Sequence, residues 1–297
     1  MFCLVFLWML SSPEMFSQNY IPYHQKIIQA EDSITMEDYE FALNMYWDAF
    51  SSVNRSFTKD LYNAAICAAI LNDTTRMFSL MEQCLKQGVC FNKFETNTAA
   101  FSHYFLSEQW KNIKKDSEYY EKIYLGQINK RYKELLDSLN VMDQIVRSEK
   151  EYCILHRPQS KKAKAQRNKI RHVDSINFEI IKQCLVRYGY PSERNMGIGS
   201  SLGYFGHVCV WHITDSSFLN IQEIAFLNGE ISVERYVAKL EYCHRECYDY
   251  FWRKKTNENC DEKRKQIGFP QSCFFEHLRN YYKKTHNIYG FVFPYYI

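Results

Sequence analysis

The chain has 297 residues, of which 46% are hydrophobic and 24% are charged, the composition of a folded protein with one large domain or two ordinary ones. Its formal net charge of +3 is too small to indicate a nucleic-acid partner. Only 10 glycines and 6 prolines are present, which argues against a β-sandwich rich in tight turns and favours helices. We therefore expect an all-α protein without a sheet of three or more strands.

The first residues have the pattern of an export signal. The run Phe2–Leu10 is apolar but too short to span a bilayer, and Phe16-Ser17-Gln18 offers a cleavage site, although no Lys or Arg precedes the run. This predicts a signal peptide over residues 1–18 and a mature protein that is periplasmic or secreted. A buried hydrophobic start is the alternative. No later segment has the length and apolarity of a membrane span.

Helical hairpins are expected over residues 19–126. Apolar residues recur there at three- or four-residue steps, the pattern of a buried helix face. The segments with this pattern are Met36–Phe50, Lys59–Leu71, Thr74–Leu85 and Phe94–Leu106. Taken in pairs they repeat at about 35 residues and alternate aromatic with alanine positions, which resembles tetratricopeptide repeats. Such hairpins would offer a concave surface to a protein or peptide partner.

A second, multi-helix domain is expected over residues 127–297. Trp110–Tyr124 predicts a last helix of the first part, and Gly126 then marks the boundary. The next helix is expected over Ile128–Tyr152, and the basic, acid-free run Arg157–Arg171 is expected to be a solvated loop.

Asp143 falls inside the apolar stripe of the first helix of this domain. A carboxylate on a buried face is costly unless it is paired, and Arg147, four residues later, is its nearest partner. One interpretation is a structural ion pair. The other is the wall of a ligand-binding pocket made by Asp143, Gln144 and Arg147.

A following helix is expected over Arg171–Tyr188, with Gly189 as its C-terminal cap. Asn177 lies within its apolar face and Asp174 on the flank of that face. Two neighbouring helices thus place polar side chains where a core favours carbon, which is typical both of functional sites and of buried hydrogen-bond networks.

An acid–base group is also present near these helices. A glycine cluster over Gly197–Gly206 is expected to be a turn-rich linker, and His212 follows it. A hydrolase could use His212 as base, Asp143 or Asp174 to orient it, and Arg147 to hold an anionic group. A core role for His212 is the alternative.

The cysteines leave three interpretations open. Cys67, Cys84 and Cys184 lie in apolar helical patterns, where a free cysteine packs as a small hydrophobe. A disulfide in the C-terminal third would suit an exported protein. The pairs Cys243/Cys247 and Cys273/His277 have helical i,i+4 spacing and could supply zinc ligands, although this is not a usual finger spacing. We expect unpaired packing, with no metal and no cofactor.

Several short motifs together resemble a known family. They are Asp143-Gln144-x-x-Arg147, Asp174-x-x-Asn177, Gly189-Tyr190-Pro191, His212, Gly229-Glu230 and Glu262–Phe269. This order resembles an uncharacterised bacterial family, a domain of unknown function that often follows tetratricopeptide-like hairpins. The resemblance covers roughly residues 30 to 284 and carries no established activity. Leu240–Cys243 stands where that family usually has an Asp-Arg pair.

The sequence therefore predicts an exported, non-catalytic helical module that binds a protein or a small ligand. Its candidate ligand-binding residues are Gln144, Arg147 and Asn177. The alternative is the hydrolase-like enzyme, whose candidate catalytic residues are Asp143, Asp174 and His212.

Overall fold

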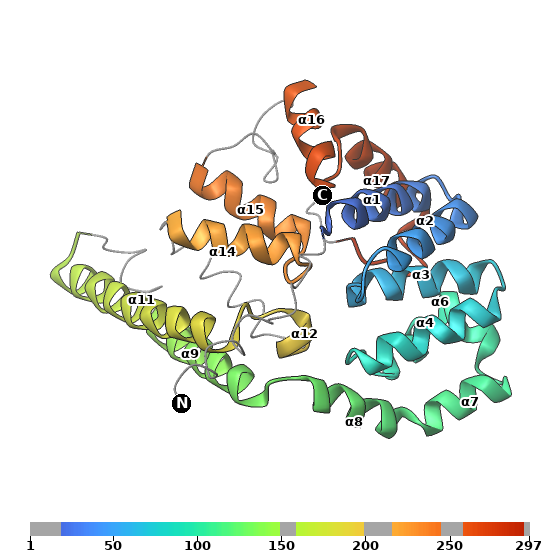
Figure 1. The fold of residues 1–297 in the computed structure, drawn as a ribbon, viewed down its shortest axis with the longest axis horizontal. Helices are drawn as coiled ribbons and strands as arrows, with labels where there is room; N and C mark the ends of the chain where they lie inside the picture. The colour runs from blue at the N-terminus through green and yellow to red at the C-terminus, as the bar shows by residue number, and fades with distance from the viewer. Residues whose placement is uncertain (1–18, 149–158, 199–215, 245–257, 294–297) are drawn as a thin grey trace, which may run out of the picture.

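The structure, a computed structural model, describes residues 19–148, 159–198, 216–244 and 258–293. All regular elements within these ranges are helices, which confirms the predicted all-α class (Figure 1). In chain order they are α1 (Ile21–Thr35), α2 (Tyr39–Ser51), α3 (Thr58–Ile70), α4 (Thr74–Lys86), α5 (Asn92–Thr96), α6 (Thr98–Phe101), the 3₁₀ turn η1 (Ser102–Tyr104), α7 (Glu108–Lys115), α8 (Ser117–Gln127), α9 (Lys130–Ser148), α11 (Lys161–Tyr188), α12 (Glu193–Met196), α14 (Ser216–Leu227), α15 (Val233–His244), α16 (Glu258–Ile267) and α17 (Ser272–Thr285). In these ranges no helix combines the length and the apolarity needed to cross a membrane.

The first four helices form two antiparallel hairpins, α1 with α2 and α3 with α4 (Figure 1). The prediction missed α1 and therefore paired the later segments wrongly. Its apolar residues are spaced as expected for a helix, at Tyr23, Ile27, Ala30 and Ile34, and all four are buried. Asp38 and Asp73 cap α2 and α4 by accepting from backbone N–H groups three residues on, which fixes where each second helix of a hairpin begins.

Shorter helices follow the hairpins. The predicted helix over Phe94–Leu106 is broken into α5, α6 and η1, and the one over Trp110–Tyr124 is divided at Asp116 into α7 and α8. Asp116 accepts no side-chain cap bond from α8, but its carbonyl accepts from Tyr119 and Tyr120. In Figure 1, α8 runs from the hairpins towards the long pair α9 and α11. Helix α8 therefore connects the two halves of the chain.

The prediction of a solvated loop over Arg157–Arg171 was wrong from Lys161 onward, because α11 already begins there. Ser160 caps this helix through its hydroxyl, which accepts from the Ala163 N–H at 3.1 Å. Lys, Ala, Gln and Arg are good helix formers, and neither Gly nor Pro interrupts them. The basic side chains are carried on a helix. The C-terminal end agrees with the prediction, since Gly189 caps the helix with a φ of +76°.

Two hydrophobic cores hold the fold together. One is formed by α1 to α8, and the other by α9, α11, α14, α15 and the segments around α16 and α17. The chain end returns to the first core: Phe291 is 3% exposed, and the Val292 backbone exchanges two hydrogen bonds with the Asn63 side chain on α3. At the other end, the Tyr20 N–H donates to the Leu227 carbonyl at 3.0 Å, so the start of α1 is fixed to the end of α14.

Candidate functional site

Asp143 and Arg147 form the pair that the helical spacing predicts. Asp143 is 2% exposed, and the Arg147 Nε lies 2.9 Å from each of its carboxylate oxygens. The Arg147 Nη2 also donates to Asp174 Oδ1 on α11 at 2.6 Å. The guanidinium therefore bridges α9 and α11 through two carboxylates.

Two more of the predicted residues, Gln144 and Asn177, lie on the same two helices as this bridge. Gln144 donates to Asp143 at 3.2 Å, and Asn177 is buried one turn after Asp174 on α11. His212 lies outside the described residues. The structure thus brings together five of the six candidates. Since Arg147 is already bound to both acids, this geometry favours the structural ion pair over a site that holds a substrate anion.

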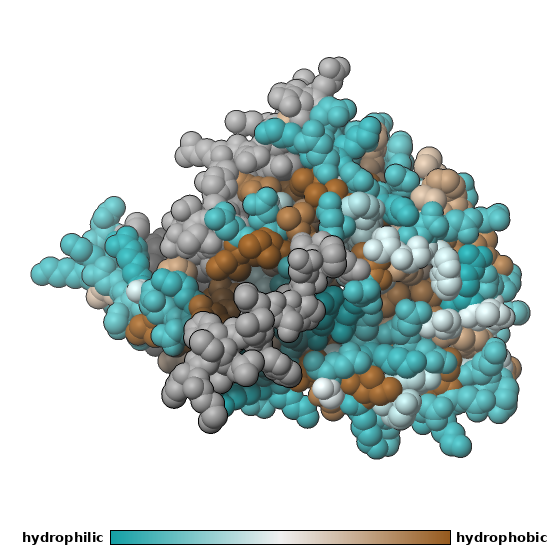
Figure 2. Space-filling model, viewed as in Figure 1, coloured by the Kyte–Doolittle hydropathy of each residue, from teal (hydrophilic) through white to brown (hydrophobic). Residues whose placement is uncertain are grey.

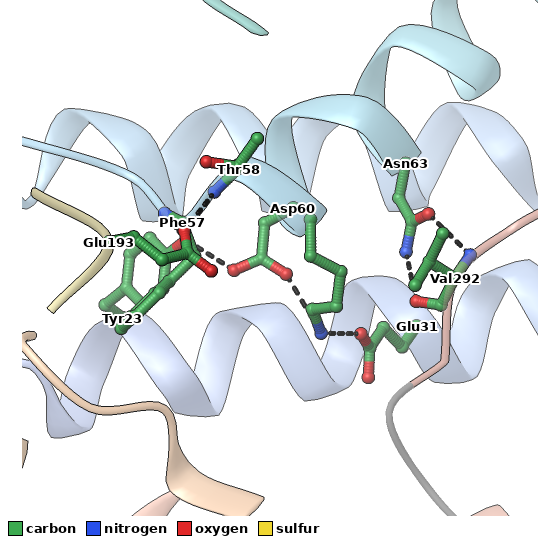
Figure 3. A network of polar contacts seen from close by, with 9 residues as sticks. Tyr23, Glu31, Phe57, Thr58, Asp60, Asn63, Glu193 and Val292 are labelled. Atoms are coloured by element: carbon green, nitrogen blue, oxygen red, sulfur yellow. Dashed lines mark hydrogen bonds and ion pairs between the residues drawn. The ribbon is translucent and has the colours of Figure 1, made fainter. Parts of the chain in front are cut away.

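A second polar network lies between α1 and α3, and the sequence analysis did not identify it. Lys59 on α3 donates to Glu31 on α1 at 2.5 Å and pairs with Asp60 at 3.0 Å. Tyr23 on α1 donates to the other Asp60 oxygen at 2.5 Å and accepts from the Phe57 N–H at 3.1 Å. Figure 3 shows these side chains meeting in the gap between the two helices.

Two members of this network, Lys59 and Asp60, line a cavity of about 90 Å³. Its walls come from α1, from the start of α3, from the turn before α12, and from the turn between α14 and α15. A water molecule needs roughly 10–15 Å³ of such space, so the cavity holds several waters or a head group of a few heavy atoms. The two halves of the chain meet at this cavity.

The α14–α15 turn is fixed in place by a glycine. Gly229 has a φ of +69°, and a Cβ at this position would lie 2.3 Å from the Tyr20 ring. Only glycine combines this backbone conformation with so close an approach. The N–H of Glu230 then donates to the Ala225 carbonyl at 2.8 Å, which closes the end of α14. As a result Glu230 and Glu234 reach the cavity wall.

His24 on α1 lines the cavity with an unsatisfied nitrogen. The side chain is 3% exposed, and its Nε2 has no hydrogen-bond partner among the described residues. The imidazole stacks on Phe226 with centroids 5.2 Å apart, and Phe226 stacks on Tyr236 at 4.5 Å. A buried polar atom without a partner costs about 1–3 kcal/mol, so a ligand that supplies a partner would recover part of this cost.

Burial sets the protonation of the groups around the cavity. It lowers the pKa of His24 to about 3, with the Lys59 ammonium acting in the same direction, so the imidazole is neutral. Burial also raises the pKa of Glu31 to about 7, against the effect of Lys59. Desolvation lowers the pKa of Lys59, but the carboxylates of Asp60, Glu31 and Glu234 outweigh it and raise the pKa overall. Lys59 is therefore charged.

Carboxylates outnumber cations among the described residues that line this cavity, and the Arg194 guanidinium acts on Glu230 from beside it. Among the described residues that line it, the acids are Asp60, Glu193, Glu230 and Glu234, and the bases are Lys59 and Arg235. Lys59 is already paired with two carboxylates. Glu193 accepts from the Thr58 N–H at 3.3 Å, at the positive N-terminus of α3. With His24 neutral, the cavity offers acceptors to a positively charged group.

The described cysteines differ in their state. Cys67, Cys84 and Cys184 are free and buried, as expected for cysteines that pack as hydrophobes. Cys260, in the C-terminal third, is disulfide-bonded, so the expectation of unpaired cysteines was wrong at this position. The His277 Nδ1 lies 2.8 Å from Asp32 Oδ1, and Cys273 is exposed and free. Cys243 and Cys247 fall outside the side chains that are described. Within the described ranges, no group of three His, Cys, Asp or Glu side chains is placed to hold a metal ion.

The signal that identified Asp143 was also present for the cavity network. Glu31 lies in the apolar stripe of α1, four residues after Ile27 and three before Ile34, and it is 0% exposed. The predicted helices do not include α1, so the predicted buried acids do not include Glu31. The approach of Glu234 to Lys59 has no local signal, since the two lie far apart in sequence and meet only in the folded chain.

Comparisons with known proteins give no match for this chain: no protein-family model, no curated protein and no solved structure is similar to it. The resemblance to a family of unknown function therefore stays a prediction.

Proposed function

We propose that the protein is a non-catalytic binding module that takes a small, positively charged group of its ligand into the cavity between α1, α3 and α15. The observation that carries this proposal is the buried, unpartnered His24 Nε2 at the wall of a cavity whose charged lining residues are mainly carboxylates. A neutral imidazole can accept a hydrogen bond from an ammonium or a guanidinium, and the carboxylates favour its charge.

The size of the cavity supports a head group as its occupant. About 90 Å³ accommodates a few heavy atoms but not a drug-sized molecule. The group can belong to a free amine or to a Lys or Arg side chain of a peptide. A peptide would agree with the hairpin surface, which we propose is tetratricopeptide-like, because α1 and α3 contribute both to the hairpins and to the cavity.

The hydrolase alternative has weaker support. It relies on Arg147 to hold a substrate anion, and that guanidinium is bound to Asp143 and Asp174. Its base, His212, lies outside the described residues. Binding at the His24 cavity needs no rearrangement of these ion pairs.

We also propose that the protein is exported. The apolar run at residues 2–10 motivates this, and the disulfide bond of Cys260 supports it, since disulfides persist mainly in oxidising compartments. Sequencing the N-terminus of protein from the native source tests the proposal. A mature start near Gln18 is expected, and an intact Met1 on protein from the cytosol would contradict it.

Three small molecules of nearly equal size test the binding site: n-propylammonium, 1-propanol and propionate. Titration of each into the protein by calorimetry should show saturable binding of the cation and none of the other two. Glu234→Gln removes one cavity charge and should weaken binding of the cation by about tenfold, equivalent to roughly 1.4 kcal/mol.

The matched control is Glu262→Gln, an exposed acid on α16 that does not line the cavity. Its affinity for n-propylammonium should equal that of the wild type. Preference for propionate, or equal affinity in Glu234→Gln and wild type, would refute the proposal.

A further inference from the structure

A second, larger cavity lies beside the first. Its volume is about 470 Å³, and it lies between the last turns of α11 and the middle of α14. The side chains that line it are mainly apolar and include Phe178, Leu185, Val186, Tyr190, Ile221 and Ile224, and its two charged lining residues are Lys182 and Glu230. Such a lining suits the hydrocarbon part of a ligand rather than a charged group.

The two cavities adjoin at Glu230, which lines both of them. The chain passes from one to the other twice: Tyr190 borders the apolar cavity and Pro191 the polar one, and Ala225 borders the apolar cavity and Ile231 the polar one. The Glu230 carboxylate therefore marks the boundary that a ligand occupying both cavities has to cross.

Part of the apolar lining is exposed to solvent. Ile224 is 59% exposed and Val186 is 91% exposed. Figure 2 shows apolar side chains gathered at the place where α14 lies in Figure 1. Contiguous exposed apolar surface is typical of a binding groove. The adjoining carboxylates determine which kind of apolar ligand fits, because the head group next to the tail must be compatible with their negative charge.

We propose that the ligand is an amphiphilic cation, with its ammonium or guanidinium head in the polar cavity at His24 and its apolar tail in the cavity between α11 and α14. This inference rests on the proposed function and specifies the ligand class for the same site. A long-chain primary amine has this chemistry, and so does a peptide in which Lys or Arg stands beside large apolar residues.

A series of straight-chain alkylammonium ions, from propyl to octyl, tests the position of the tail. Each methylene buried should tighten binding by about fourfold, which corresponds to about 0.8 kcal/mol for a buried CH₂. Ile224→Ser should reduce this dependence on chain length, because it makes the wall of the apolar cavity polar, while the affinity for propylammonium stays as in the wild type. Leu106→Ser is the control, since Leu106 is 85% exposed and does not line this cavity.

The same series distinguishes the two ways in which the account can fail. If propylammonium binds and is weakened by Glu234→Gln, but octylammonium binds no more tightly, the tail inference is overturned and the proposed function stands. If 1-octanol binds as tightly as octylammonium, the charged head group does not contribute to binding. That result, or a series in which no member binds, would overturn both the tail inference and the proposed function. A peptide source is tested separately: Leu-Lys-Leu should compete with octylammonium, and Leu-Glu-Leu should not.

Discussion

The Nζ of Lys59 lies 2.5 Å from the Oε1 of Glu31, and this contact joins the first helix of one hairpin to the first helix of the next. Glu31 is 0% exposed and the Lys59 side chain is 19% exposed. Asp60 lies 3.0 Å from the same ammonium. This ammonium therefore pairs with two buried carboxylates, and Lys59 and Asp60 also line the proposed binding cavity.

Removing this ammonium should destabilise the fold. Lys59→Met leaves two buried carboxylates without their cation, and breaking a buried pair costs about 3–5 kcal/mol. We expect a loss of about 3 kcal/mol at pH 8 by urea denaturation, and a smaller loss at pH 5, where Glu31 can take up a proton.

Lys114→Met is the matched control. Lys114 pairs with Glu95 at 2.6 Å, but its side chain is 57% exposed, so its removal should cost less than about 1 kcal/mol. Equal losses in the two variants would contradict a special role for the buried pair.

His24 should make the stability depend on pH. Its pKa of about 3 in the folded state lies below the 6.5 of an unfolded chain, so the unfolded state binds the extra proton between these values. Stability is therefore fully present above pH 6.5 and is lost as the pH falls towards 3. Glu31 acts oppositely: its pKa is raised from 4.5 to about 7, so its contribution is fully present below pH 4.5 and is lost as the pH rises towards 7.

His24→Phe isolates the first of these two effects. Between pH 6 and pH 4, the wild type should lose about 1.4 kcal/mol of stability for each unit by which the pH falls, because of His24. The variant lacks this group, so its stability relative to the wild type should rise by the same amount. At pH 8 its stability should equal or exceed that of the wild type, because a buried unsatisfied nitrogen is removed and the ring stacking on Phe226 is kept. If the difference in stability between His24→Phe and the wild type did not change with pH, His24 would not be buried as a neutral ring.

Local spacing predicted the features that depend on one helix or two neighbouring ones. The burial of Asp143, its pairing with Arg147, and the Gly189 cap follow from a 3.6-residue period and from the positive φ that glycine tolerates. The His24 cavity could not be predicted in this way, because Lys59 and Glu234 meet only through the packing of α1, α3 and α15. The long α11 was missed at its start, since a run of basic residues is compatible with either a loop or an exposed helix.

Asp143→Ala should destabilise the fold by roughly 3 kcal/mol, because it leaves Arg147 without one of its two carboxylates in a mostly buried site. Asp143→Asn should cost less, since the amide oxygen can still accept a hydrogen bond. Glu179→Ala, which removes an exposed pair with Lys182, should change stability by less than about 1 kcal/mol. Thermal melts compare the three, and a melt of Asp143→Ala that matches the wild type would favour a ligand-binding role instead.

Gly268→Ala should disturb both stability and binding. Gly268 has a φ of +70°, and a Cβ there would lie 2.6 Å from the His24 Cβ and 2.7 Å from the Gln25 nitrogen. The backbone conformation alone costs about 1–2 kcal/mol, and the contact must move α1 at the cavity wall. We expect a loss of more than about 2 kcal/mol in urea denaturation and weaker binding of n-propylammonium.

Gly126→Ala is the control for this variant. A Cβ at Gly126, in α8, meets nothing within 4 Å, so alanine should stabilise the helix by about 0.5–1 kcal/mol. A destabilisation of the same size in both variants would mean that the contact with α1 is not the cause.

The most direct measurement is the NMR spectrum of the His24 imidazole nitrogens during titration with n-propylammonium. The account predicts that the Nε2 resonance shifts and saturates with the dissociation constant found by calorimetry, while the ring stays neutral, and that His24→Phe binds the cation more weakly. Saturable binding that leaves both His24 nitrogens unchanged, with full affinity in His24→Phe, would contradict it.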